Sequence, residues 1–223
     1  MTEAGIGHAE AHFIIGENCY AVHKQEPPMS SLRLALVRIV LSAVFTAAVG
    51  GLEAAEGAAS PAAPPFPSAR AADWIGTPAS WASLRGQVVL LDVWTFACGN
   101  CRATMPWLKD VRQKYAAKGL TLVGIHTPEM IFERERPKVE AEVKRQGLDY
   151  PHLLDNDSAY WNALGAQYWP TVYLVDRCGR LRDRHIGEVH SGAESGRRVE
   201  ASIEALLAEP AGACATPAAE ARR

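Results

Sequence analysis

Residues 88–106 read VVLLDVWTFACGNCRATMP, and this stretch decides the fold. Its first seven residues are apolar except for Asp92, which is typical of a strand buried on both faces of a sheet. A short turn with Cys98 and Cys101 follows, and a helix is expected to begin at the first cysteine. The stretch therefore predicts a buried strand, a turn with two cysteines and a helix.

A cysteine at the first turn of a helix is well suited to react as a thiolate. The backbone N–H groups there are unpaired, and the helix dipole adds partial positive charge. We therefore expect the Cys98 thiolate to be stabilised over the thiol. Cys101 lies one turn further along the same side, where it can attack a mixed disulfide on Cys98. The pattern predicts a dithiol/disulfide redox pair, with Gly99 and Asn100 between its cysteines influencing its potential.

Two other uses of paired cysteines fit the sequence less well. A zinc site needs two further ligands, and the chain has no second CxxC. Covalent haem attachment requires a histidine directly after the second cysteine, where this chain has Arg102. Zinc and haem sites are therefore disfavoured.

The composition is that of a globular protein. The chain has 223 residues, of which 48% are hydrophobic and 22% charged. A net charge of −2 gives no sign of a nucleic-acid-binding surface. Five cysteines are too few for a disulfide-stapled scaffold.

The N-terminal part has the pattern of a secretory signal. Residues 39–52 (IVLSAVFTAAVGGL) carry no charge, follow two arginines and precede a run of small residues. We place the signal peptide at residues 29–59. The apolar run is shorter than the roughly 20 residues of a membrane-spanning helix, so cleavage is favoured over an uncleaved anchor. Residues 1–28 do not fit this pattern, and we interpret Met29 as the true start, with residues 1–28 untranslated or disordered.

The rest of the chain divides by composition. Residues 60–71 are rich in proline and alanine, which predicts a linker because proline lacks an amide donor. Residues 72–208 predict the folded domain, and residues 209–223 a flexible tail.

Hydrophobic periodicity within the domain predicts alternating strands and helices. Strands are expected at 87–94, 120–126, 151–155, 171–176 and 181–186, and helices at 98–115, 137–146, 158–164 and before the tail. Ser191 and Glu194 are expected to form a capping box for the last helix. This order predicts an α/β sandwich with a mixed central β-sheet flanked by helices.

The chain resembles the thioredoxin superfamily, and within it the TlpA-like and DipZ-like thiol-disulfide oxidoreductases (redoxins) of the bacterial cell envelope. The resemblance runs from Trp74 to Leu207 and includes none of residues 1–70. It rests on these segments, in order: LRGQVVLLDVWTFACGNCRATMP, GIHTPEMIFERE, YPHLLDND, YWPTVYLVDRCGRL and HIGE. It implies a thioredoxin-like sandwich and thiol-disulfide oxidoreductase activity.

The resemblance also implies roles for individual residues. Cys98 is the attacking cysteine and Cys101 the resolving one. Pro170 matches a cis-proline that faces the CxxC, although the sequence alone favours a trans proline at an edge strand. Trp169 and Thr171 flank this proline and are expected to help bind an extended substrate peptide, as are Gly99 and Asn100 between the cysteines.

Three residues before the CxxC have two interpretations each. Asp92 matches the buried acid of thioredoxin, which would have a raised pKa and take the proton of Cys101; the alternative is a partnered acid without a catalytic role. Trp94 and Phe96 are expected to shape the apolar surface around Cys98, and the alternative is core packing.

The roles of four further side chains are left open by the sequence. Glu129 and Glu133 look like acids that the subfamily places near the active-site face, and we interpret them as exposed. Cys178 and Cys214 could form a disulfide in an oxidising compartment.

The resulting prediction is a periplasmic, monomeric enzyme that reduces protein disulfides. Its expected partners are protein disulfide substrates and a membrane electron donor, and cytochrome c maturation is one task that the family implies. No cofactor, metal or nucleic acid is expected.

Two other functions stay open. The segment Thr95–Cys98 resembles the TxxC of peroxiredoxin-like thiol peroxidases, but Leu91 stands where that motif has a proline. A copper or metal chaperone on the same fold would use CxxxC, one residue longer than the spacing here.

Overall fold

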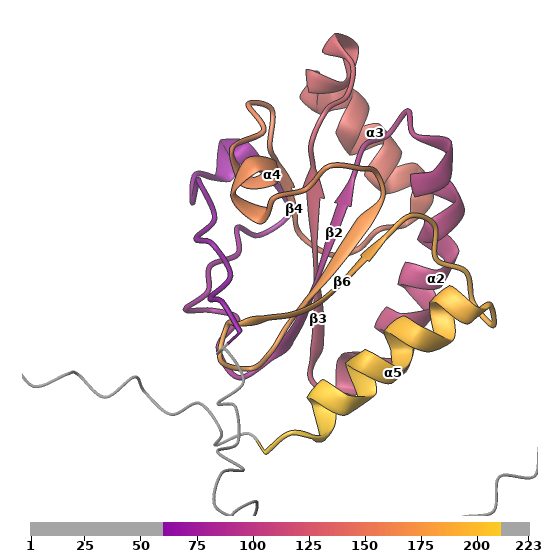
Figure 1. Cartoon of the computed structure of the whole chain (residues 1–223). Helices are drawn as coiled ribbons and strands as arrows, with labels where there is room; N and C mark the ends of the chain where they lie inside the picture. Colours follow the sequence, from indigo (N-terminus) through magenta and orange to yellow (C-terminus); the bar gives the residue numbers. More distant parts are fainter. Residues whose placement is uncertain (1–59, 211–223) are drawn as a thin grey trace, which may run out of the picture. The chain divides into compact units, whose positions relative to one another are not determined.

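The computed structural model describes residues 60–210, and its centre is a six-stranded mixed sheet (Figure 1). The strand order is β1-β4-β3-β2-β5-β6. β2, β3 and β4 are parallel, whereas β1, β5 and β6 run antiparallel to their neighbours. The strands are β1 (Trp74–Ile75), β2 (Val88–Trp94), β3 (Leu120–His126), β4 (His152–Leu154), β5 (Thr171–Val175) and β6 (Leu181–Ile186). The predicted α/β sandwich with a mixed central sheet is confirmed.

Helices lie on both faces of this sheet, as Figure 1 shows. Buried side chains of α2, α3 and α5 join one core, and those of α4 join the other. The α-helices are α2 (Gly99–Tyr115), α3 (Arg136–Gln146), α4 (Ala159–Leu164) and α5 (Glu194–Ala208). Three short 3₁₀ turns are η1 (Ala71–Asp73), η2 (Ala116–Lys118) and η3 (Ile131–Arg134).

Strand β2 supplies side chains to both cores because successive residues point to opposite faces. Val88, Leu90 and Trp94 pack with α2, whereas Val89, Leu91 and Val93 pack on the face covered by α4. Every residue of β2 is buried, which explains its continuous apolar sequence. By the same alternation, Asp92 points to the face that carries α2 and its cysteines.

The segment 60–71 packs against the domain, which differs from the linker that its composition predicts. Ala62 forms a β-bridge with Arg180, and the Ala63 amide donates to the Gly179 carbonyl at 2.8 Å. Phe66 stacks on Trp81 and Tyr160, with ring centroids 5.1 and 4.9 Å apart. Proline-rich sequence can still pack through aromatic contacts, so the expected linker is corrected for the described part of it.

The expected capping box of the last helix is also wrong. The N-cap residue of α5 is Ala193, which has no side-chain hydrogen bond. Ser191 instead donates to Asp110 on α2 at 2.5 Å. The start of α5 is therefore fixed by a contact to another helix.

Several predictions lie outside the described residues. The signal peptide, the proposed start at Met29, residues 1–28 and most of the C-terminal tail with Cys214 fall in residues 1–59 and 211–223. Cys178 is disulfide-bonded, and its pairing with Cys214 stays a prediction. Within residues 60–210, no helix has both the length and the apolar character needed to cross a membrane.

Candidate active site

The two cysteines occupy the first turn of α2, where the sequence predicts them. Cys98 is the N-cap residue, and its sulfur accepts a hydrogen bond from the Cys101 amide at 3.2 Å. Both cysteines are free thiols. Cys98 is half-buried, whereas only 2% of Cys101 is exposed. The Cys98 thiol can therefore react with an external partner, while the Cys101 thiol is shielded from solvent.

Burial disfavours ionisation of the Cys101 thiol. Desolvation and the hydrogen bond with Cys98 raise the pKa of the Cys101 thiol, and the nearby Asp92 charge adds to this. The Thr95 backbone hydrogen-bonds the same thiol and acts in the opposite direction. Cys101 therefore needs a proton acceptor before it can attack.

Asp92 is buried on the same side of β2. Its carboxylate accepts one hydrogen bond from the Tyr150 hydroxyl, at 3.2 Å. Burial raises the pKa of Asp92 to about 7, and the bond from Tyr150 offsets only part of the effect. The raised pKa that the sequence predicts is confirmed, and the group can exchange a proton near neutral pH.

A second buried carboxylate, Glu133, contacts the loop that precedes the cysteines. The sequence predicts an exposed acid at this position, but the side chain has no exposed surface. Oε1 accepts from Thr95 Oγ1 at 2.5 Å and from the Ala97 amide at 2.9 Å. Oε2 accepts from the amides of Glu129 and Met130 at 2.8 and 2.7 Å. Glu129 itself is exposed, as expected.

Four donors outweigh burial at this carboxylate. Desolvation opposes ionisation of Glu133, but the bonds from Thr95, Ala97, Met130 and Glu129 hold the pKa of Glu133 below its ordinary value. Nothing in the local sequence marks this acid as buried, because two of its donors lie 36 and 38 residues earlier.

The sequence also did not predict a contact of Arg102, whose guanidinium donates to the Phe96 carbonyl at 3.0 Å.

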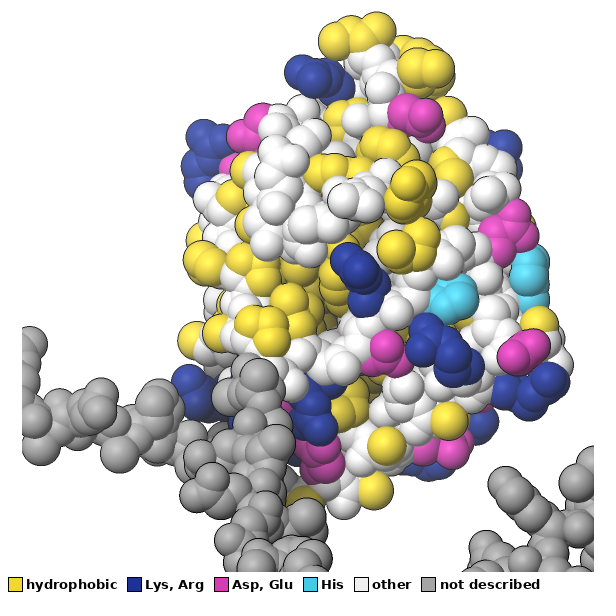
Figure 2. All heavy atoms as spheres, in the orientation of Figure 1, with side chains coloured by type: hydrophobic (Ala, Val, Ile, Leu, Met, Phe, Trp, Pro, Cys, Tyr) yellow, Lys and Arg dark blue, Asp and Glu magenta, His cyan; other side chains and the backbone are white. Residues whose placement is uncertain are grey.

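Apolar side chains are exposed in the segment 130–132, which contacts Phe96, two residues before Cys98. Met130, Ile131 and Phe132 are 53%, 77% and 43% exposed. The Phe132 ring lies edge-on to Phe96, with centroids 5.8 Å apart. We call these four residues the apolar rim. Figure 2 shows apolar side chains at the upper end of this face, over the segment that leads into α3 in Figure 1.

The segment before β5 lies near the end of β2 that leads to Cys98. The Trp169–Pro170 peptide bond is cis, as the resemblance implies. Trp169 stacks on Trp161 with centroids 4.1 Å apart and donates to the Thr127 carbonyl at 3.1 Å. Register places Thr171 opposite Val93, near the end of β2 that leads to Cys98.

Two residues expected to bind substrate have buried side chains. Trp94 is 1% exposed and packs edge-on to His126 and His152, so it belongs to the core. Thr171 is also 1% exposed, and its hydroxyl donates to the Tyr168 carbonyl at 2.6 Å. Substrate contact by these two side chains is therefore corrected to core packing. Phe96 and Trp169 are half-buried, and Gly99 and Asn100 are exposed.

Two buried histidines pack behind the cysteines. Burial lowers the pKa of His126 to about 4 and that of His152 to about 3, so both rings are neutral at pH 7. The His152 ring occupies space over Gly124, where a Cβ atom would lie 2.0 Å from its Nδ1. Close packing with the histidine therefore requires glycine at this position of β3.

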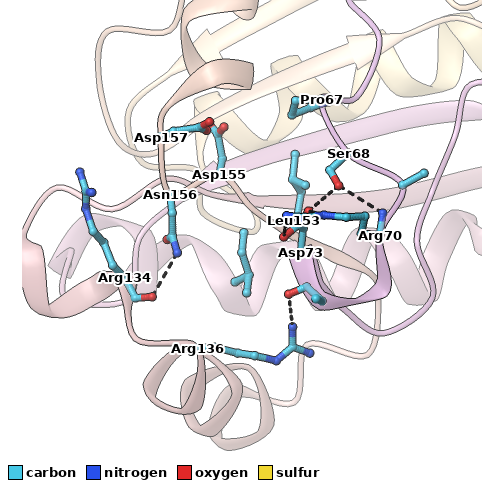
Figure 3. A pocket seen from close by; sticks show the side chains of 13 residues that line it. Pro67, Ser68, Arg70, Asp73, Arg134, Arg136, Leu153, Asp155, Asn156 and Asp157 are labelled. Carbon is cyan, nitrogen blue, oxygen red and sulfur yellow. Dashed lines mark hydrogen bonds and ion pairs between the residues drawn. The ribbon is translucent and has the colours of Figure 1, made fainter.

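A separate cavity of about 740 Å³ lies between the segment 67–73 and the end of β4 (Figure 3). Three of its charged groups have partners: Arg70 binds Asp73 at 2.8 Å, and Arg136 donates to the Ala72 carbonyl at 2.7 Å. Asn156 donates to the Arg134 carbonyl at 3.1 Å. No cysteine lines this cavity, so the candidate redox site is the CxxC.

Comparison with known proteins places this site in a family. The Redoxin family model matches residues 61–203. Protein DipZ of Mycobacterium tuberculosis is 39% identical over 119 residues, which are 52% of this chain and 17% of DipZ. Thiol-disulfide oxidoreductase YkuV of Bacillus subtilis is 26% identical over 120 residues, 54% of this chain and 77% of YkuV. The chain therefore spans about a sixth of DipZ and about three quarters of YkuV.

Solved structures agree on the fold. A thiol:disulfide interchange protein of the thioredoxin family from Chlorobium tepidum TLS has a TM-score of 0.53 at 25% identity, over 66% of this chain and 97% of that one. The thioredoxin-like superfamily protein SPOA0173 has a TM-score of 0.59 at 22% identity, over 68% and 99%. From the family model and the thioredoxin-like fold together, we conclude that this chain belongs to the Redoxin family.

Proposed function

We propose that this chain is a thiol-disulfide oxidoreductase that reduces disulfides in proteins. The observation that carries the proposal is the pairing of a half-exposed Cys98 at the start of α2 with a buried Cys101, whose backbone amide donates to the Cys98 sulfur. The start of a helix stabilises a thiolate, and the second thiol is close enough to resolve a mixed disulfide.

The reaction balances as a two-electron exchange. The Cys98 thiolate attacks one sulfur of the substrate disulfide, and the other sulfur leaves as a thiolate that takes up a proton. Cys101 then loses its proton and attacks Cys98, which releases the second substrate sulfur. The substrate gains two electrons and two protons, and the enzyme is left with a Cys98–Cys101 disulfide. A dithiol donor must reduce that disulfide before the next cycle.

Asp92 is the proposed proton acceptor for Cys101. Its carboxylate is buried beside the resolving cysteine, and its pKa of about 7 suits proton transfer at neutral pH. Tyr150 keeps the carboxylate in place through a single hydrogen bond. Cys101 can therefore be deprotonated without an external base.

The apolar rim and the Trp169–Pro170 segment form the proposed substrate surface. A disulfide in a loosely folded protein is flanked by apolar side chains, which would pack on the rim as its sulfur reaches Cys98. Gly99 and Asn100, which are exposed, complete the accessible surface around this cysteine.

The proposed setting is the cell envelope. The leader-like residues 39–52 support export, and in an oxidising compartment a reductase needs electrons from a membrane donor. Reduction of apocytochrome c cysteines is a specific task consistent with this setting. The enzyme is proposed to act as a monomer.

The test compares the wild type with two variants. In an insulin reduction assay with dithiothreitol as electron donor, we expect Cys98→Ser to abolish catalysis. Cys101→Ser should accumulate a mixed disulfide between Cys98 and a protein substrate, detected by mass spectrometry. Wild-type protein that does not accelerate insulin reduction would contradict the proposal.

The reduction potential tests the direction of electron flow. Equilibration with thioredoxin or glutathione buffers should give a value near roughly −270 mV, as for thioredoxin, whereas about −120 mV would identify an oxidant.

A further inference from the structure

The contacts of Glu133 join two separate segments of the chain. One oxygen, Oε1, accepts from Thr95 and Ala97, and the other, Oε2, accepts from the amides of Glu129 and Met130. The second pair alone would explain a local cap for the turn η3 (Ile131–Arg134). The first pair has no such explanation, because it lies on the loop that connects β2 to the cysteines.

The loop donors are direct neighbours of the redox pair. Ala97 immediately precedes Cys98, and the Thr95 backbone hydrogen-bonds the thiol of Cys101. The carboxylate therefore fixes the backbone on which both sulfurs depend. Among the described residues, the hydrogen bonds of Glu133 go to Thr95, Ala97, Glu129 and Met130 and to neither sulfur, so this acid is a positioning residue.

We propose that Glu133 holds the backbone before Cys98 in the geometry that keeps this sulfur at the start of α2. This inference rests on the proposed function, since it concerns the reactivity of the same cysteine. Without the carboxylate, the Ala97 amide and the Thr95 hydroxyl lose their partner, and the loop can relax. The sulfur then moves away from the unpaired amides of the first helical turn, which stabilise its thiolate.

A direct electrostatic effect of Glu133 would have the opposite sign. A negative charge near a thiolate disfavours ionisation, so removing the charge alone would make Cys98 ionise more easily. Positioning predicts that Cys98 ionises less easily when the carboxylate is lost. The direction of the change therefore distinguishes the two roles.

The other titratable groups around the loop are left unmutated in Glu133→Gln. They are Cys101 and Arg102 on α2, Asp92 on β2 and His126 on β3, which is buried and neutral. A change in the pH dependence of Cys98 is therefore assigned to Glu133 and its donors.

The test measures alkylation of Cys98 by iodoacetamide across pH, read at the level of the Cys98 peptide by mass spectrometry. For Glu133→Gln in the full chain, we expect the midpoint of the pH–rate profile to rise by about one unit. The rate at pH 7 should fall by up to about tenfold, because a smaller fraction of Cys98 is then thiolate. The matched control is Glu129→Gln, which makes the same charge change at an exposed side chain and should stay within about twofold of wild type.

Two results would overturn the inference. A midpoint that moves to lower pH would show that Glu133 acts only through its charge. An unchanged midpoint in both Glu133→Gln and Thr95→Val would show that Glu133 only caps η3, because a glutamine oxygen can still accept from the two loop donors. If Glu133→Gln does not fold, Thr95→Val decides, because it removes one donor and keeps the charge. This variant should shift the midpoint in the same direction by a smaller amount, and no shift there would count against positioning.

Alkylation requires no disulfide substrate, so the two proposals can fail separately. Wild-type protein without reductase activity would refute the proposed function, while the response of Cys98 to Glu133→Gln would still report on positioning.

Discussion

Asp92 and Glu133 are both buried carboxylates near the same cysteine pair, and their pKa values are shifted in opposite directions from the ordinary values. Asp92 accepts one hydrogen bond, and its pKa is raised to about 7. Glu133 accepts four, and its pKa lies below the ordinary value. Burial alone therefore does not decide the charge of an acid; the number of donors facing the carboxylate does.

The contrast assigns different tasks to the two acids. A carboxylate that titrates near neutral pH can take a proton from Cys101 and return it. A carboxylate that stays ionised can hold amides and a hydroxyl in fixed positions. The proposed roles follow this contrast: Asp92 on β2 accepts the proton of Cys101, and Glu133 holds the backbone of the loop before Cys98.

The largest expected effect is the removal of the Asp92 charge. The pKa of Asp92 is higher in the folded protein than its value of 3.8 in the unfolded chain. Its contribution to stability is therefore complete below pH 3.8 and is lost as pH rises through about 7. Asp92→Asn should therefore raise the free energy of unfolding at pH 8 by on the order of 3 kcal/mol and change it little at pH 4. Urea denaturation at both pH values measures this.

Asp149→Asn is the matched control for that experiment. Asp149 is exposed and pairs with Arg112 at 2.9 Å, so its loss should cost about 1 kcal/mol or less. If the free energy of unfolding changed equally with pH in both variants, the buried Asp92 would behave no differently from a surface acid, which would contradict the prediction.

The same Asp92→Asn variant should be a slow enzyme. Without a buried proton acceptor, resolution by Cys101 should slow about 10- to 100-fold at pH 7, within the range of general base catalysis. Alkylation of Cys98 should change little. Stopped-flow measurement of mixed-disulfide decay separates the two steps, and unchanged decay would exclude Asp92 as the base.

Glu133→Gln should change stability with the opposite pH dependence. A lowered pKa contributes stability above the unfolded value of about 4.5, and this is lost as pH falls through the folded value. We expect the variant to lose about 1–3 kcal/mol at pH 7, the cost of unpaired donors that had faced a charged group. The deficit should shrink toward pH 3. A deficit that is constant with pH would show that the carboxylate is not ionised.

The smallest effect is expected at the apolar rim. Ile131 is 77% exposed, so Ile131→Ser should leave stability nearly unchanged. Reduction of a protein disulfide should slow about threefold through lost apolar contact, whereas reduction of a small aromatic disulfide should not. Equal losses for both substrates would place the rim outside the recognition surface.

The sequence was sufficient where local pattern decides structure. The apolar run of β2 and the spacing of Cys98 and Cys101 predicted strand, turn and helix, and the resemblance added the cis bond before Pro170. In contrast, burial of Trp94 depends on neighbours from β3 and β4, and burial of Glu133 depends on donors in a distant loop. Charged residues between exposed ones look solvent-facing until the fold brings their partners together.

The most direct test of the central claim is a titration of the two carboxyl carbons by NMR in protein labelled with ¹³C at the side chains of aspartate and glutamate. Asp92→Asn and Glu133→Gln assign the two signals. Asp92 should titrate near pH 7, and Glu133 should remain ionised below 4.5, the ordinary value for glutamate. Titration of both groups at the same pH, or of Glu133 above Asp92, would contradict the division of roles.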